Sequence, residues 1–265
     1  FERCEFTKEE WYKIKRKCDQ EKILFLSTPQ NYSDLQLLLD LDIKAIKVGS
    51  DDLTNLPLLK KFASTNLPII LSSGMSTLDE VSEALDTVGF FSGHPTILLI
   101  TTSQYPTPPK DVNLMKFHTL SKKFPDLILG FSDHTIGPIA SSLACVLGAV
   151  FFEKHFTLDC NLQGPDHWFS ANPEQLKIWR DSIITSFEML GDPTVKPTKH
   201  ELINKKEFQR IVLAKKIINK GELFTDENLE MKRVSGGNGL SGKMYDKLLG
   251  IKATKNFKKG NKIEL

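Results

Sequence analysis

The chain has 265 residues, of which 35 are basic and 33 acidic, and its formal net charge is +2. This length accommodates one large domain, or one medium and one small domain. The lysines are interleaved with acidic residues and form no basic stripe, which excludes the electrostatic footprint of a nucleic-acid-binding protein. The longest nearly apolar run, from Ile139 to Phe152, is shorter than the ~18–20 residues of a membrane span, so we expect no membrane partner.

The cysteines show no paired spacing of the kind that marks a metal or disulfide framework. Cys4, Cys18, Cys145 and Cys160 are widely separated, which disfavours a zinc knuckle and a disulfide scaffold. Reduced thiols are typical of a cytoplasmic protein, and we expect that location. The chain begins at Phe1 without a signal-peptide pattern. We expect it to start partway into a longer protein.

Six apolar runs alternate with helical patterns between residues 23 and 190, and each run ends in polar residues or glycine. The runs are Ile23–Thr28, Ile43–Ser50, Leu67–Gly74, Thr96–Ser103, Leu127–Asp133 and Val150–Phe156. Strict alternation predicts an α/β fold with a parallel sheet and helical crossovers. Strands buried on both faces explain the continuous apolar character. A (β/α)₈ TIM barrel needs eight such units, so we expect a barrel whose first two units lie upstream of residue 1.

The last quarter of the chain has a different sequence pattern from the first three quarters. The partial barrel is expected to span residues 1–191. Residues 192–207 contain Pro193 and Pro197 among many lysines, which indicates a linker. Residues 208–265 hold short strand-like pieces separated by glycine turns. We therefore predict a second, small and mostly-β module, which buries little core alone and would gain from docking on something else.

Polar side chains close four consecutive runs at the points where parallel strands would end. They are Lys47, Ser50, Ser72, Ser73, Thr101, Thr102, Ser103 and Ser132. A lysine surrounded by hydroxyls and by the backbone N–H groups of Gly49 and Gly74 suits a phosphate or another anion. A single strand-end serine more often satisfies the backbone of a turn. The coincidence over four strands favours an anion site.

Two histidines, His134 and His155, lie at the ends of the fifth and sixth runs, at matching positions. Because neighbouring strands lie ~4.8 Å apart, both imidazoles can bind one divalent metal. Two protein nitrogens leave positions open for water and substrate, as a catalytic metal requires. A lone histidine is more often a loop or capping residue, and His94, His118 and His200 have no partner in the pattern.

The loop Gly164-Pro-Asp-His167 can fold over the same edge of the sheet. Asp166 can orient a sugar hydroxyl or a ligand water there, whereas His167 can equally be a solvated loop residue.

These residues lie in motifs that resemble those of the sialic acid synthase family, the N-acetylneuraminate and legionaminate synthases. The matching motifs follow the family's order and span nearly the whole first module: Phe25-Leu-Ser-Thr-Pro29, Ile46-Lys-Val-Gly-Ser50, Ile70-Leu-Ser-Ser-Gly-Met75, Tyr105-Pro-Thr-Pro108, Gly130-Phe-Ser-Asp-His-Thr135, Glu153-Lys-His-Phe-Thr157 and Gly164-Pro-Asp-His167. Residues 208–265, with Lys220-Gly-Glu, Asn228-Leu and Lys232-Arg233, are similar to the small C-terminal SAF (antifreeze-like) domain of these enzymes.

The resemblance implies a transferase that condenses phosphoenolpyruvate with an N-acyl hexose of the N-acetylmannosamine type. The product is a nine-carbon 2-keto sugar acid, and phosphate is released. By motif, the phosphate of phosphoenolpyruvate is held by Lys47, Ser50, Ser72, Ser103 and Ser132.

The resemblance also assigns the other site residues. His134 and His155 bind Mn²⁺, with Mg²⁺ or Co²⁺ as alternatives. Tyr105 and Asp166 line the sugar side as catalytic residues. Arg233 touches the N-acyl group from the partner subunit of a domain-swapped homodimer.

The family's first two strands, which carry an acidic residue beside the reacting carbon and a second lysine, have no counterpart in this chain. We therefore expect the chain to be inactive alone and a longer parent to be active. One alternative is a related synthase that uses a different sugar, which an arginine aimed at an acyl amide disfavours. Another is a catalytically silent anion- or sugar-binding remnant, which the missing strands favour and the intact Lys47, His134 and His155 disfavour.

Overall fold

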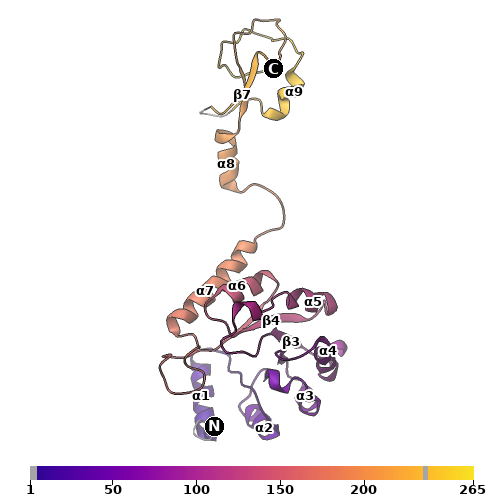
Figure 1. The fold of residues 1–265 in the computed structure, drawn as a ribbon, viewed down its shortest axis with the longest axis vertical. Coiled ribbons are helices and arrows are strands. Elements are labelled where there is room, and N and C mark those ends of the chain that lie inside the picture. Colours follow the sequence, from indigo (N-terminus) through magenta and orange to yellow (C-terminus); the bar gives the residue numbers. More distant parts are fainter. Residues whose placement is uncertain (1–4, 235–237) are drawn as a thin grey trace. The chain divides into compact units, whose positions relative to one another are not determined.

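The computed structural model describes residues 5–234 and 238–265, so Cys4 lies outside the described residues. The chain divides into two compact units, Phe1–Gly191 and Asp192–Leu265 (Figure 1). Each unit has its own hydrophobic core. In the described part of the chain, no helix is both long enough and apolar enough to cross a membrane.

The described part of the first unit contains one parallel sheet whose five strands follow chain order. They are β1 (Ile46–Val48), β2 (Ile69–Ser72), β3 (Thr96–Ile100), β4 (Ile128–Asp133) and β5 (Phe151–Lys154). Each strand pairs in parallel with the next. The predicted α/β class and parallel sheet are confirmed, and the sheet has the topology of a partial barrel.

Helices connect the strands and follow one another in an arc around them (Figure 1). The α-helices of this unit are α1 (Lys8–Gln20), α2 (Tyr32–Asp40), α3 (Leu56–Ala63), α4 (Leu78–Thr87), α5 (Lys116–Lys123), α6 (Ile139–Val146) and α7 (Pro173–Leu190). Short 3₁₀ turns are η2 (Ser50–Asp52), η3 (Phe90–Ser92) and η4 (Pro109–Asp111). Helices α1, α4 and α7 begin with capping boxes at Thr7, Thr77 and Asn172, which satisfy otherwise unpaired N–H groups.

The prediction of six strand–helix units is wrong by one strand. Among the described residues, no β-ladder includes the run Ile23–Thr28. The Ile23 N–H bonds back to the carbonyl of Cys18 at the end of α1, and the Ile23 and Leu24 side chains are both 62% exposed. Phe25 nevertheless packs into the core. An apolar run alone does not make a strand, because a strand also needs a neighbour for its backbone hydrogen bonds.

Side chains alternate between the two faces of the sheet, as the two-residue period of a strand requires. One set, which includes Ile46, Val48, Ile69, Leu71 and Phe131, packs in the main core with the helices. The other set begins with a small apolar cluster of Ala45, Ile70 and Leu99. Towards the carboxyl ends of the strands, this second set becomes polar.

The second unit is built from short β elements and short helices. They are α8 (Lys199–Phe208), β6 (Ile211–Ala214), β7 (Leu229–Lys232), η5 (Gly242–Met244) and α9 (Tyr245–Leu248). The two strands pair antiparallel, and isolated bridges add Ile218 to Phe257 and Leu213 to Lys262. The predicted linker 192–207 therefore includes most of a helix. The sequence signal for it was the capping box between Thr198 and Glu201.

Candidate active site

A cavity of about 450 Å³ lies at the carboxyl ends of the five strands. Its lining residues are Lys47, Gly49, Ser50, Asp51, Ser72, Met75, Thr101, Ser103, Tyr105, Ser132, His134, Glu153 and His155. All of the site residues that the resemblance assigns, except Asp166 and Arg233, therefore meet in one place, whereas the strand-end residues Ser73 and Thr102 do not line the cavity. Lys47 on β1, Ser72 on β2 and Ser132 on β4 share a sheet face because alternate residues of parallel strands point the same way.

The first side of the cavity is a cradle of hydroxyls around one ammonium group. Lys47 Nζ donates to Ser72 Oγ at 2.8 Å and to the Val48 carbonyl at 3.1 Å. Burial lowers the pKa of Lys47 below its ordinary value, and the nearby Glu153 carboxylate opposes that shift. A partly desolvated ammonium beside hydroxyls favours an anionic ligand.

The loop after β2 completes this cradle. Gly74 N–H donates to Ser50 Oγ at 3.1 Å, and Ser103 Oγ is buried with no hydrogen-bond partner among the described residues. A Cβ added at Gly74 would lie 2.3 Å from Ser103 Oγ and 2.6 Å from Ser50 Oγ. Glycine is therefore required here, because any side chain would collide with the Ser50 and Ser103 hydroxyls.

Glu153 is a site residue that sequence reasoning missed. Its Oε1 accepts a 2.6 Å hydrogen bond from Ser132 Oγ, and its Oε2 lies 3.4 Å from Lys47 Nζ. In the sheet, Ser132 lies opposite Glu153. The signal that could have found it is the two-residue period, since Glu153 shares the face of His155.

The two predicted histidines lie side by side at the other edge of the cavity. Their ring centroids are 5.2 Å apart. His134 Nδ1 lies 2.8 Å from the Thr102 carbonyl. A carbonyl can only accept, so Nδ1 carries the proton and Nε2 is an acceptor, 3.4 Å from Ser132 Oγ. Burial lowers the pKa of both His134 and His155, which favours their neutral, ligating form.

These residues fit a divalent metal bound by two imidazoles. A histidine that donates its second N–H to a backbone carbonyl, as His134 does, has the orientation typical of metal ligands. In the described part of the chain, no group of three or more histidine, cysteine, aspartate or glutamate side chains is arranged to hold a metal. A metal at this edge would have His134 and His155 as its protein donors, and water or substrate would fill its other positions.

Aromatic rings wall the histidine side of the cavity. The ring of Tyr105 lies 4.2 Å from that of His134 and 5.5 Å from that of His155. Phe169 packs on Tyr105 and His155 at 5.5 Å and 5.0 Å. Burial raises the pKa of Tyr105 above its ordinary value, so its phenol stays protonated and can donate a hydrogen bond.

The other two predicted residues lie elsewhere. Asp166 does not line the cavity, but its Oδ2 is 3.9 Å from His155 Nδ1 at the rim, and its side chain is 57% exposed. Arg233 belongs to the second unit, where its guanidinium lies 4.1 Å from the ring centroid of Phe208.

A buried polar network behind the sheet fixes the positions of both histidines. Asp133, directly before His134, is fully buried and accepts hydrogen bonds from Thr135, Ser141 and Trp179. Lys154, directly before His155, lies 3.3 Å from the Asp133 carboxylate. The ends of β4 and β5 are thus joined to each other and to helices α6 and α7.

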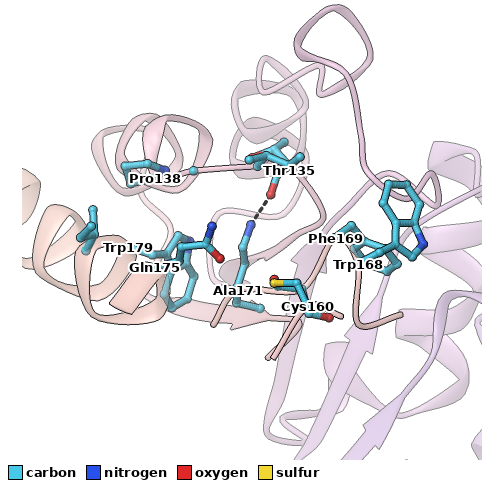
Figure 2. A pocket seen from close by; sticks show the side chains of 13 residues that line it. Thr135, Pro138, Cys160, Trp168, Phe169, Ala171, Gln175 and Trp179 are labelled. Atoms are coloured by element: carbon cyan, nitrogen blue, oxygen red, sulfur yellow. Dashed lines mark hydrogen bonds between the residues drawn. The ribbon is translucent and has the colours of Figure 1, made fainter. Parts of the chain in front are cut away.

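A second cavity, of about 260 Å³, lies beside this network (Figure 2). Lys154 and Trp179 line it, together with the apolar side chains of Pro138 and Phe169. Figure 2 shows the hydrogen bond from the lysine to the Thr135 carbonyl. This ammonium is already paired, so it stabilises the strand ends and leaves the cavity with mainly apolar walls.

Residues 1–195 match the model of the NeuB family. The chain belongs to this family. It is 43% identical over 246 residues to the N,N'-diacetyllegionaminic acid synthase of Campylobacter jejuni, covering 92% of this chain and 72% of the relative. It is 35% identical over 249 residues to the pseudaminic acid synthase of Helicobacter pylori, covering 94% and 72%.

Among solved structures, the N-acetylneuraminic acid (sialic acid) synthetase of Leptospira borgpetersenii is similar to the chain. The TM-score is 0.70 at 32% identity, covering 76% of this chain and 70% of that one. The predicted resemblance to the sialic acid synthase family is therefore confirmed.

Proposed function

We propose that the chain carries the phosphate and metal sites of a transferase that condenses phosphoenolpyruvate with an N-acyl hexose, in a (β/α)₈ barrel of which it supplies the last strands. The observation that supports it most is the single cavity that brings an anion cradle and a histidine pair within one sheet edge. C3 of the enolpyruvate attacks the sugar aldehyde, water adds at C2, and the C–O bond to phosphate breaks. The product is a nine-carbon 2-keto sugar acid.

In this reaction, the cradle holds the group that leaves. Lys47 and the hydroxyls of Ser50, Ser72, Ser103 and Ser132 bind the phosphate oxygens. The Lys47 charge stabilises the negative charge that collects on phosphate as the C–O bond breaks. The cavity wall favours this interaction because Lys47 is partly desolvated there.

The histidine side receives the aldehyde. A divalent metal such as Mn²⁺, held by His134 and His155, would polarise the aldehyde oxygen as a Lewis acid. Tyr105 covers the histidine rings and offers its phenolic O–H to the sugar, while Asp166 at the rim accepts from a sugar hydroxyl. The small second unit is proposed to be an SAF domain, whose Arg233 contacts the N-acyl group in the partner subunit of a homodimer.

The test uses the full-length protein. Phosphate release from phosphoenolpyruvate is measured with Mn²⁺ and a panel of N-acyl hexoses, with and without a chelator, and phosphoenolpyruvate alone is titrated calorimetrically. Release that needs both the sugar and the metal supports the proposal. A protein that shows neither phosphate release nor phosphoenolpyruvate binding would overturn it. Binding without release would favour the silent anion-binding alternative.

A further inference from the structure

Glu153 occupies two of the donors that a bound phosphate needs. One carboxylate oxygen accepts from Ser132 Oγ at 2.6 Å, and the other lies 3.4 Å from Lys47 Nζ. Both donors line the same cavity. A second anion cannot take its full set of contacts with Lys47 and Ser132 while the carboxylate holds them, since each donor has a limited number of hydrogens.

The charges in the cavity explain why Glu153 contacts Lys47. In the described part of the lining, Lys47 is the single lysine or arginine, and its side chain is only 12% exposed. A partly buried ammonium without a partner is costly, so the free protein needs a counter-ion for it. Glu153 supplies one from the neighbouring strand end. The Ser103 hydroxyl, in contrast, is buried beside Tyr105, and its oxygen has no geometric hydrogen-bond partner among the described residues.

We propose that Glu153 is an internal counter-ion that a substrate's phosphate must displace from Lys47, and that this competition selects dianions over monoanions. A monocarboxylate offers Lys47 no more charge than Glu153 already does, and it also loses its freedom of motion on binding. A phosphate dianion brings twice the charge to Lys47. After C–O cleavage, the displaced Glu153 carboxylate repels the free phosphate. As the phosphate leaves, the carboxylate returns to Lys47.

This inference rests on the proposed phosphate site, and a binding experiment separates the two. The 265-residue chain is titrated calorimetrically with inorganic phosphate, and separately with acetate, at pH 8 and constant ionic strength. Glu153→Gln keeps the size of the side chain and an acceptor for Ser132 but removes the charge. Because a partly exposed ion pair of this kind contributes about 1 kcal/mol, we expect phosphate to bind about fivefold more tightly to this variant, and acetate binding to become measurable.

The matched control is Asp51→Asn, which removes the same charge from the same cavity. Asp51 lines the cavity and acts on Lys47 only through its longer-range field. Its substitution should therefore change phosphate affinity by less than Glu153→Gln does. Glu153→Ala serves as a second variant, and unchanged circular dichroism shows that each variant is folded.

The outcomes are distinct. Tighter phosphate binding by both Glu153 variants supports the inference. Equal or weaker binding by them, while the unmodified chain binds phosphate, overturns the inference and leaves the proposed function intact. A chain and variants that all fail to bind phosphate overturn the phosphate site itself. A gain of equal size in Asp51→Asn reduces the effect to general charge in the cavity and also overturns the specific role of Glu153.

Discussion

Removing the Asp133 carboxylate should be among the most destabilising substitutions in the first unit. The side chain is fully buried and accepts from Thr135 N at 2.8 Å, Ser141 Oγ at 2.6 Å and Trp179 Nε1 at 3.0 Å. It also balances Lys154, whose side chain is 5% exposed. Breaking one side of a buried ion pair costs about 3–5 kcal/mol, because the other charge stays buried without its partner. We therefore expect Asp133→Ala to lose about 3–5 kcal/mol of unfolding free energy.

The assay is urea unfolding followed by tryptophan fluorescence. The chain's tryptophans, Trp11, Trp168 and Trp179, all lie in the first unit, so the signal reports that unit alone. Adding Lys154→Met to Asp133→Ala should recover about 1–3 kcal/mol, since the uncompensated charge is gone.

The control for this experiment is Asp40→Ala, which removes a half-exposed carboxylate paired with Lys8. It should change stability by less than about 1 kcal/mol. A loss below about 1 kcal/mol for Asp133→Ala, or a double variant as unstable as the sum of the two single ones, would refute the reasoning.

Three further predictions concern the cavity. Gly74→Ala should weaken phosphate binding about tenfold or more in calorimetry, because its Cβ would fill the cradle. Gly93→Ala strains the backbone, since Gly93 has a φ of +93°, but its Cβ meets nothing within 4 Å, so the folded variant should keep its phosphate affinity. His134→Ala should abolish Mn²⁺ binding measured by electron paramagnetic resonance; the control His94→Ala should retain it, since that ring only bonds the Leu67 carbonyl. In chelator-treated protein, the free energy of unfolding should fall as the pH drops below the ordinary histidine pKa of 6.5. Burial lowers the pKa of His134 and His155 in the folded protein. Below pH 6.5 the unfolded chain therefore binds more protons than the folded one. Urea unfolding at pH 7.5 and pH 5.5 checks this. An equal loss of unfolding free energy between these pH values in a His134→Gln, His155→Gln double variant would contradict it.

The sequence determined which residues would meet. Regular alternation of apolar runs and helical patterns specifies parallel strands, and parallel strands bring their carboxyl ends to one edge. That rule alone placed Lys47, Ser72, Ser132, His134 and His155 together, without any knowledge of side-chain geometry. Local periodicity and the polar residue that ends each run carry this information.

The tertiary structure decided what the sequence pattern could not. The run Ile23–Thr28 has the composition of a strand, yet pairing depends on a neighbour's hydrogen-bonding edge, which is not a property of the run. The sequence pattern does not distinguish the roles of the two acidic residues Glu153 and Asp133. Their different roles follow from which sheet face each occupies and which partners other strands and helices bring within about 3 Å. Contacts between distant segments, and the desolvation that gives them their strength, exist only once the chain is folded.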